Sequence, residues 1–169
     1  MVGLREWTVD DADWYAGTVA NDELILRFTT ESPDVTADEV RAAILALSAG
    51  APDRIGYLIH DPATGERLGN IAITYEDGVG HVSYWLAEAA RGRGVATEAV
   101  RLMCARAFAE HGLREIRLYA RADNAASRAV AERAGFRRDP GRDRTRVVRG
   151  RPWPDVAYSL PAPRSRGGT

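Results

Sequence analysis

The middle of the chain carries three apolar runs separated by short polar segments. The runs RIGYLIH (54–60), RLGNIAITY (67–75) and GHVSYWLA (80–87) are rich in branched and aromatic residues, which pack well on a pleated surface. The segments DPATGE and EDGVG between them contain turn-forming residues. We therefore expect a meander of three antiparallel strands.

Helical periodicity and capping signals predict helices on both sides of this meander. In residues 36–50, Thr36 and Glu39 have the spacing of a capping box, and Gly50 suits the position after the last turn. Further helices are expected within residues 10–22, from about 94 to 111, and over 124–135.

The remaining apolar runs predict more strands and complete an α+β layout. Strands are expected at 4–8 and 114–122, and residues 136–160 predict a strand, a loop and a last strand. A chain of 169 residues is long enough for one hydrophobic core. We expect a single domain over residues 1–160 and a disordered C-terminal tail over residues 161–169.

The charge is distributed unevenly along the chain, although the net charge is −1. Residues 1–50 hold 10 acidic residues and 3 arginines (net −7), residues 51–90 hold 6 and 2 (net −4), and residues 91–169 hold 8 and 18 (net +10). All 23 basic residues are arginine, which excludes a catalytic or phosphate-binding lysine. The asymmetry suggests two partners of opposite charge, although two solvated faces would explain it as well.

Other function classes find little support in the composition. No window is apolar enough for a membrane span, and the N-terminus lacks the apolar stretch of a signal peptide. We therefore expect a cytoplasmic protein with no membrane partner. The single cysteine, Cys104, permits no intrachain disulfide, and the three histidines have no metal-ligand spacing, so no metal is expected.

The stretch YWLAEAARGRGVATEAV (84–100) is a strand-to-helix junction. Free N–H groups and the helix dipole attract anions at such a junction, and Gly92 and Gly94 would let an oxygen-rich ligand approach the backbone. The P-loop pattern needs a lysine, and the dinucleotide fingerprint needs a glycine where Thr97 stands. From these residues alone, a phosphate site and a plain polar turn both remain open.

Together with DNAASRAVAERAGF (123–136), this stretch resembles the GNAT superfamily of acetyl-CoA-dependent N-acetyltransferases, and most closely its RimJ/RimL-like branch. The match is strongest over residues 84–136. The resemblance implies a mixed, mostly antiparallel sheet of about seven strands flanked by about four helices. It also implies acetyl-CoA as co-substrate and a primary amine as acceptor, either a protein N-terminus or a small cationic amine.

The resemblance assigns a cofactor-binding role to the glycine-rich junction. The family's pyrophosphate-binding pattern falls on Arg91, Gly94 and Ala96, and the pantetheine arm is expected along the strand that contains Trp85 and Leu86. A backbone N–H near Leu86 could then stabilise the oxyanion. The expected cradle comprises Arg91, Gly92, Arg93, Gly94, Val95, Ala96 and Thr97.

The family's Asn-x-x-Ser pattern falls on Asn124 and Ser127. By resemblance Asn124 binds the cofactor arm, Ser127 stabilises the thiolate, and Arg128 lies near a phosphate; both Asn124 and Ser127 could instead only cap a helix. Many relatives protonate the thiolate with a tyrosine at the position of Ala131. That acid is missing here.

The general base is the least certain part of the site. His81 lies where RimJ/RimL-like chains often have glutamate, and its ordinary pKa suits a base; an ordinary strand-end histidine is the alternative. Glu76 and Asp77 are other candidates, although a turn explains both. The acidic residues expected to favour a cationic acceptor are Asp10, Asp11, Asp13, Asp22, Glu23, Glu31 and Asp34.

Two other classes of function remain open at this stage. The missing tyrosine would suit a catalytically silent acyl-CoA-binding regulatory domain. The arginine-rich residues 136–151 would suit a nucleic-acid-binding module, but they lack a recognisable motif, and no nucleic acid is expected. The protein could be a monomer or a homodimer.

Overall fold

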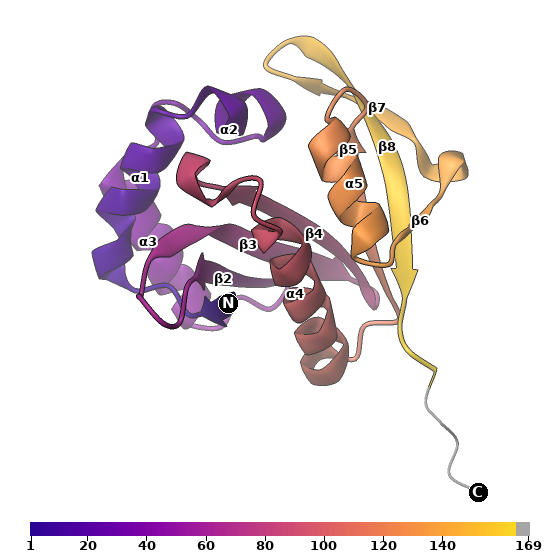
Figure 1. Ribbon diagram of the computed structural model, residues 1–169, viewed down its shortest axis with the longest axis horizontal. Helices are drawn as coiled ribbons and strands as arrows, with labels where there is room; N and C mark the ends of the chain where they lie inside the picture. The colour runs from indigo at the N-terminus through magenta and orange to yellow at the C-terminus, as the bar shows by residue number, and fades with distance from the viewer. Residues whose placement is uncertain (165–169) are drawn as a thin grey trace, which may run out of the picture.

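An eight-stranded sheet organises residues 1–164, which are the residues that the computed structural model describes (Figure 1). The strand order is β1-β2-β3-β4-β5-β8-β6, and β7 pairs with β8. Every pairing is antiparallel except that of β4 with β5. The strands are β1 Gly3–Arg5, β2 Arg54–His60, β3 Arg67–Glu76, β4 Val79–Leu86, β5 Glu115–Arg121, β6 Arg137–Arg138, β7 Arg144–Val148 and β8 Arg151–Pro161.

Five α-helices and three 3₁₀ turns complete the described residues. The helices are α1 Ala12–Ala20, α2 Glu23–Phe28, α3 Ala37–Ser48, α4 Val95–His111 and α5 Ala125–Arg133, and the turns are Val9–Asp11, Glu88–Ala90 and Pro140–Arg142. The mixed α+β class and the three-stranded meander β2-β3-β4 are confirmed.

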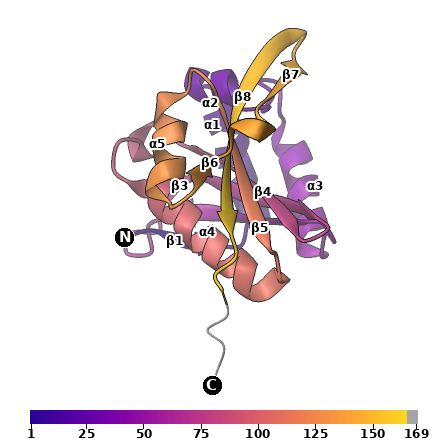
Figure 2. The same cartoon turned by 90° about the vertical axis from the view of Figure 1, so that its right-hand side faces the viewer.

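Helices cover both faces of the sheet. The main core packs β3 and β4, through residues such as Ile71 and Val82, against Ala99 and Met103 of α4. A second cluster on the other face joins Leu58 of β2 to α3. Figure 2 shows α4 and α5 on one side of the sheet and α3 on the other. The strands are therefore buried from both sides, and a side chain's place in a strand decides which layer it enters.

The segment expected to form a strand, a loop and a last strand contains an additional strand, β7. Its connection to β8 is the two-residue turn Arg149–Gly150, in which φ is 51° and 72°. Positive φ at both positions is the hairpin turn that matches strand twist. Arg144 and Arg146 of β7 both bind the buried carboxylate of Asp155 in β8, at 3.2 and 2.7 Å. These ion pairs join the two strands of a hairpin formed by a segment that reads as a charged loop.

The first helical region is divided into two helices by Asp22. Its side chain accepts hydrogen bonds from the N–H groups of Leu24 and Ile25 and so caps α2. One helix is expected within residues 10–22, and α2 is an addition to it. Asp22 is a typical N-cap residue, so the signal is present in the sequence.

The C-terminal end of the sheet extends to the start of the expected tail. β8 includes Pro161, and the N–H of Ala162 donates to the carbonyl of Arg114 at 2.9 Å. Residues 165–169 of the tail expected to be disordered lie outside the described residues.

Asp11 ties the start of the chain to the meander. Its fully buried carboxylate accepts hydrogen bonds from Arg5 at 2.8 and 2.9 Å, from Arg67 at 2.7 Å and from the N–H and hydroxyl of Thr8. Burial alone would raise the pKa of Asp11, but these hydrogen bonds hold it well below its ordinary value. The expectation that Asp11 faces a cationic acceptor is therefore wrong.

Replacing Asp11 by Asn should lower the free energy of unfolding at pH 7 by about 3 kcal/mol, because a buried ion pair loses one partner. The folded-state pKa of Asp11 is lowered, so its contribution is present above the ordinary pKa of about 3.9 and declines below it. The difference between the two proteins in urea denaturation should shrink by about 1 kcal/mol between pH 5 and pH 3. The exposed neighbour offers a control, Asp10→Asn, which should have little effect at either pH; a difference independent of pH would contradict the prediction.

Candidate functional site

β4 and β5 pair over four residues and then separate. The parallel ladder joins residues 79–82 to residues 115–118. Beyond it, β4 remains paired with β3 as far as Leu86, and β5 remains paired with β8 as far as Arg121. The backbone of residues 83–86 therefore faces an opening in the sheet instead of a neighbouring strand.

Leu86 presents a backbone donor to this opening. The N–H of Ala87 donates to the carbonyl of Leu68 on β3 at 2.9 Å, and successive N–H groups along a strand point to opposite sides. The N–H of Leu86 consequently points away from β3. The carbonyl of Leu86 accepts a hydrogen bond from Nη2 of Arg91 at 2.9 Å, so the donor is the free group.

On the α5 side of the opening, the structure brings Asn124 and Ser127 together with Tyr84. Asn124 Oδ1 accepts the N–H of Ser127 at 3.1 Å, and the hydroxyl of Tyr84 donates to Ser127 Oγ at 3.2 Å. Arg128, which was expected near a phosphate, has its Nε and Nη1 atoms on Tyr158 and on the carbonyl of Ala122, each at 3.3 Å. Asn124 is thus the N-cap of α5, and the hydroxyl of Ser127 accepts a hydrogen bond from Tyr84 of β4.

The junction before α4 offers backbone donors. Gly92 and Gly94 have φ of 71° and 77°, a conformation that favours glycine. In residues 1–164, no group accepts a hydrogen bond from the N–H groups of residues 92–97. Arg91 is already bound to Asp22 and Leu86, and Arg93 to the carbonyl of Ala89. The cradle can therefore bind an anion chiefly through its backbone and the helix dipole.

On the opposite face, His81 lies one residue before Val82, the last residue of β4 that pairs with β5. Its ring stacks on Tyr119 of β5, with centroids 5.7 Å apart and planes 6° apart. Burial lowers the pKa of His81, and the charges of Arg117 and Arg144 lower it further. His81 is therefore a neutral imidazole at pH 7, which can accept a proton.

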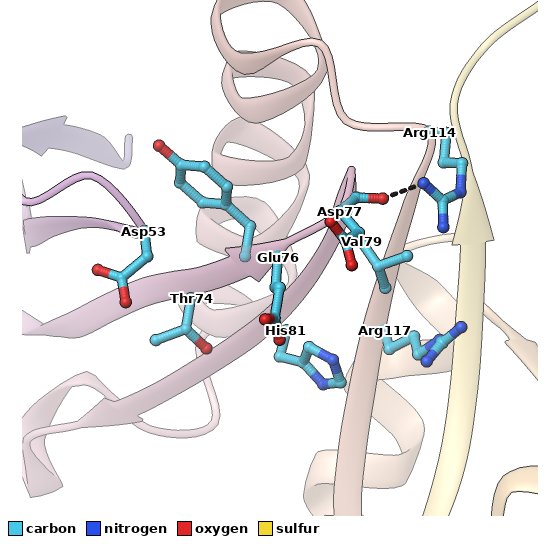
Figure 3. A pocket seen from close by; sticks show the side chains of 9 residues that line it. Asp53, Thr74, Glu76, Asp77, Val79, His81, Arg114 and Arg117 are labelled. Atoms are coloured by element: carbon cyan, nitrogen blue, oxygen red, sulfur yellow. Dashed lines mark hydrogen bonds between the residues drawn. The ribbon is translucent and has the colours of Figure 1, made fainter.

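His81 borders an open polar pocket of about 590 Å³. Both other candidate bases, Glu76 and Asp77, line the same pocket, and Figure 3 shows them at the turn between β3 and β4. The remaining lining residues are Asp53, Thr74, Tyr75, Val79, Arg114 and Arg117. The structure thus brings all three candidate bases to one pocket.

Glu31, in the segment after α2, is held beside Trp85. Its Oε1 atom accepts hydrogen bonds from the hydroxyl of Tyr15 at 2.5 Å and from Nε1 of Trp85 at 3.2 Å. Burial and the Glu31 carboxylate raise the pKa of Tyr15, so its phenol remains a donor. Glu31 also lines a largely apolar cavity of about 340 Å³ under α3, whose floor includes Ala72, the ladder partner of Ser83.

Two other acidic residues expected to attract an acceptor bind arginine within the fold. Asp13 lies 2.8 Å from Arg41, and Asp22 lies 2.6 Å from Arg91. Of the acidic residues in the first third of the chain, Glu31 is the one whose carboxylate contacts β4 at the opening.

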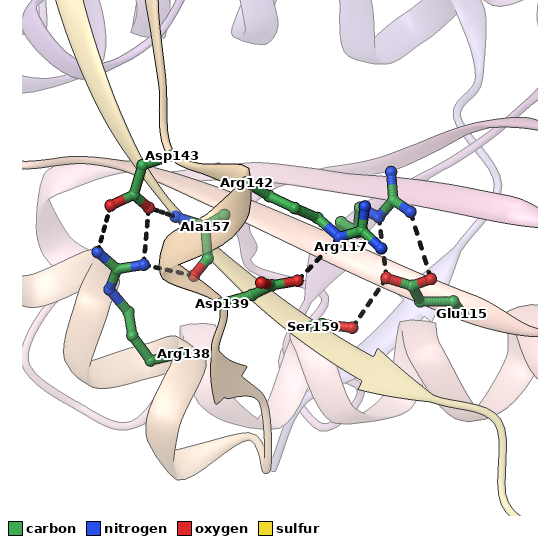
Figure 4. Close-up of polar contacts among 8 residues, drawn as sticks. All are labelled: Glu115, Arg117, Arg138, Asp139, Arg142, Asp143, Ala157 and Ser159. Carbon is green, nitrogen blue, oxygen red and sulfur yellow. Dashed lines mark hydrogen bonds and ion pairs between the residues drawn. The ribbon is translucent and has the colours of Figure 1, made fainter.

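The arginine-rich C-terminal segment is internally paired. Arg138 binds Asp143 at 2.6 and 2.7 Å, and Arg142 binds Asp139 at 2.8 Å (Figure 4). Nearby, Arg117 binds Glu115 at 2.9 Å. These ion pairs give no support to the alternative of a nucleic-acid-binding module, because acidic residues bind four of its arginines, Arg138, Arg142, Arg144 and Arg146.

The comparison with protein families identifies the class. A model of the acetyltransferase (GNAT) domain matches residues 2–137, so the chain belongs to the GNAT acetyltransferase family. This confirms the resemblance noted from the sequence. No curated protein matches the chain.

Solved GNAT structures share the whole fold. Ribosomal-protein-S5-alanine acetyltransferase from Vibrio fischeri is 17% identical with a TM-score of 0.83 over 95% of this chain and 93% of that one. Mycobacterium smegmatis RimJ in complex with CoA-disulfide is 21% identical, with a TM-score of 0.81 over 95% of this chain and 82% of that one. Spermidine N-acetyltransferase from Vibrio cholerae in complex with CoA and spermine is 15% identical, with a TM-score of 0.80 over 95% of each chain. At these identities the likeness establishes the fold alone.

Residues 1–164 contain no helix long and apolar enough to cross a membrane. They also contain no group of three or more histidine, cysteine, aspartate or glutamate side chains that could hold a metal ion. Cys104 is buried in α4, and burial raises the pKa of its thiol to about 12.

The sequence does not single out two polar groups at the opening. Tyr84 is expected only as part of a strand, and Glu31 is one of seven acidic residues expected to favour a cationic acceptor. The alternation of β4 could have assigned Tyr84 to the face of Val82 and Leu86. No local signal could have joined Glu31 to Trp85, because the contact spans 54 positions.

Replacing Arg117 by Ala should raise the pKa of His81, because it removes a positive charge and leaves Glu115 without its partner. The imidazole resonances of His81 in an NMR titration would report the change. The control variant, Arg93→Ala, removes an arginine that binds Ala89 and should leave the pKa of His81 unaltered. An unchanged or lowered pKa in the Arg117 variant would contradict this account.

Proposed function

We propose that this protein transfers an acetyl group from acetyl-CoA to a primary amine, either a protein N-terminus or a small cationic amine. The observation that carries the proposal is the opening between β4 and β5, with free backbone donors at one end and different side chains on its two faces. The names of the similar structures agree in class: one acts on a ribosomal protein, and another was solved with CoA and spermine.

The residues at the junction fit the anionic part of coenzyme A. The free N–H groups of residues 92–97 would bind the pyrophosphate, and the glycines allow its oxygens to reach the backbone. The edge of β4 would pair with the amides of the pantetheine arm as a further strand would. Asn124 and Ser127 then lie on the side of the opening where the thioester sulfur is expected.

The acceptor would approach from the opposite face, where Glu31 and His81 lie. The Glu31 carboxylate, already oriented by Tyr15 and Trp85, would bind the acceptor's ammonium group. His81, neutral at pH 7, would take the proton that the amine must lose before or during attack. The apolar cavity beside Glu31 suits a carbon-rich part of the acceptor next to that amine.

The acceptor's ammonium group first releases one proton to water and becomes a neutral amine. The amine nitrogen then forms a bond to the thioester carbon, and its second proton passes through water to His81. The N–H of Leu86 would stabilise the oxyanion of the tetrahedral intermediate. The C–S bond then breaks and its electron pair remains on sulfur, where the Ser127 hydroxyl would donate a hydrogen bond. Because thiols have pKa values of about 8.5, the thiolate can leave without full protonation.

A catalytically silent acyl-CoA-binding domain is the second candidate. It is favoured by Ala131, which is completely buried where many relatives have the acidic tyrosine. The two candidates differ in turnover. Binding of acetyl-CoA without transfer to any peptide, aminoglycoside or polyamine in a panel would favour the silent domain.

Gly94→Asp should weaken binding of acetyl-CoA by about tenfold or more, because loss of a charge-assisted contact costs roughly 1.5–3 kcal/mol. The variant places a carboxylate at the anion site, and its aspartate also strains the backbone because φ of Gly94 is 77°. Calorimetric titration with acetyl-CoA, and with ATP and NADH for comparison, measures the effect. Gly112→Asp is the matched control, since Gly112 has φ of 60° at the other end of α4. Equal affinities in the two variants would contradict the cradle.

Glu31→Gln should lower kcat/KM for cationic acceptors by about 10- to 100-fold, since hydrogen bonds to charged groups are worth roughly 1.5–3 kcal/mol. Spermidine and peptides that begin with alanine or serine are suitable probes, assayed by release of free CoA thiol. The affinity for acetyl-CoA should be retained, which separates loss of the acceptor from loss of the fold. Asp34→Asn, an exposed change in the same segment, is the control. Equal kcat/KM in the Gln variant and the control would remove Glu31 from the acceptor site.

A further inference from the structure

Many relatives have a tyrosine at the position of Ala131 in α5, and here a tyrosine of β4 supplies a phenol close to that helix. Ala131 follows Ser127 by one helical turn, so both lie on the same face of α5. Ala131 is completely buried and contributes no polar group. From the facing strand, Tyr84 extends its hydroxyl to within 3.2 Å of Ser127 Oγ. A phenol thus reaches the start of α5 from the sheet.

We propose that Tyr84 is a positioning residue that directs the Ser127 hydroxyl toward the sulfur of the departing coenzyme A. This proposal rests on the proposed acetyl-CoA-dependent function, and it goes beyond it by assigning a role to a residue outside the family's binding pattern. Tyr84 acts through Ser127 and does not itself contact the reacting atoms.

The role of Tyr84 follows from the hydrogen-bonding capacity of the Ser127 hydroxyl. A serine hydroxyl has one proton to donate and two lone pairs that accept. Tyr84 donates to Ser127 Oγ and so occupies a lone pair. In residues 1–164, no group accepts a hydrogen bond from the Ser127 hydroxyl, and the backbone N–H of Ser127 is held by Asn124. The remaining proton of Ser127 is therefore free to point into the opening between β4 and β5.

The pKa values of Tyr84 and of the CoA thiol decide whether Tyr84 keeps its proton or transfers it. Burial raises the pKa of Tyr84 above its ordinary value of about 10, although the contact with Ser127 partly opposes this. A thiol has a pKa of about 8.5, so the proton stays on Tyr84 when the thiolate forms. When the C–S bond breaks, the electron pair remains on sulfur, Ser127 donates a hydrogen bond to it, and the thiol gains its proton from water as CoA departs.

Binding of free CoA tests this without any knowledge of the acceptor. If the bound thiolate is stabilised, the thiol pKa falls on binding and the affinity for CoA increases as the pH passes through the thiol pKa, about tenfold for each unit of pKa shift. Desulfo-CoA lacks the thiol, so its pH dependence reports every other titrating group. The affinity for CoA is divided by the affinity for desulfo-CoA at about pH 6.5 and again at about pH 9.5, on either side of the free thiol pKa. The increase in this ratio from the lower to the higher pH measures the stabilisation of the bound thiolate.

Tyr84→Phe should reduce the increase in this ratio to about a third of that in the unmodified protein, and Ser127→Ala should abolish it. Ser127→Thr keeps a hydroxyl and should preserve most of it. Tyr75→Phe is the matched control, because Tyr75 makes a comparable phenol contact with His111 at 3.4 Å at the other end of the sheet. Thermal denaturation of each variant checks folding.

Three outcomes would overturn the proposal. An increase as large in Tyr84→Phe as in the unmodified protein, with Ser127→Ala still deficient, would leave Ser127 its role and remove that of Tyr84. If CoA bound but the affinity ratio did not increase with pH in the unmodified protein or in any variant, the proposed interaction with the thiolate would be excluded, while binding of CoA would stand. If the folded protein bound neither CoA nor desulfo-CoA, the proposed function would fail, and the role of Tyr84 would fail with it.

Discussion

The separation of β4 from β5 is the constraint on which the rest of the structure depends. Each strand keeps its other neighbour, β3 or β8, so the sheet remains continuous while residues 83–86 lose a partner. An unpaired backbone N–H or C=O group costs free energy when it is buried, and only some of these groups in residues 83–86 have a partner within the chain. Arg91 binds the carbonyl of Leu86 and leaves its N–H free. The opening therefore leaves the N–H of Leu86 available to pair with another molecule.

Three arginines of the basic C-terminal third hold the two halves of the chain together across this opening. Arg91 binds Asp22 at 2.6 Å at one end. Arg121 donates to the carbonyl of Arg27 at 3.0 Å, and Arg149 donates to the carbonyl of Leu26 at 2.9 Å. Guanidinium groups suit such contacts because they present several donors in a fixed plane. The basic C-terminal third thus serves first as an internal clamp, and the backbone of the glycine-rich junction is left for an anion.

The sequence predicted those parts of the molecule that depend on local signals. The meander follows from apolar runs and turns, and the start of α3 follows from the capping box of Thr36 and Glu39, which the structure contains. Parts that depend on a side chain's partner elsewhere in the chain were missed or misassigned. The arginines of β7 bind Asp155 across a hairpin, and the carboxylate of Asp11 binds Arg67, 56 positions away. Charged residues are ambiguous in a sequence because the same residue suits a solvated surface, a buried ion pair or a ligand site.

The alternation of β4 explains how one strand can serve two halves of a reaction. Tyr84 faces α5 and Ser127, whereas His81 and Trp85 face the opposite layer with Tyr119 and Glu31. Proton removal and departure of the thiolate would then occur on opposite faces of one strand, and the N–H of Leu86 lies in the plane between them. A shift of one residue in the register of β4 would exchange the two sets of side chains. The β3–β4 ladder, continuous from Glu76–Val79 to Gly69–Leu86, fixes that register.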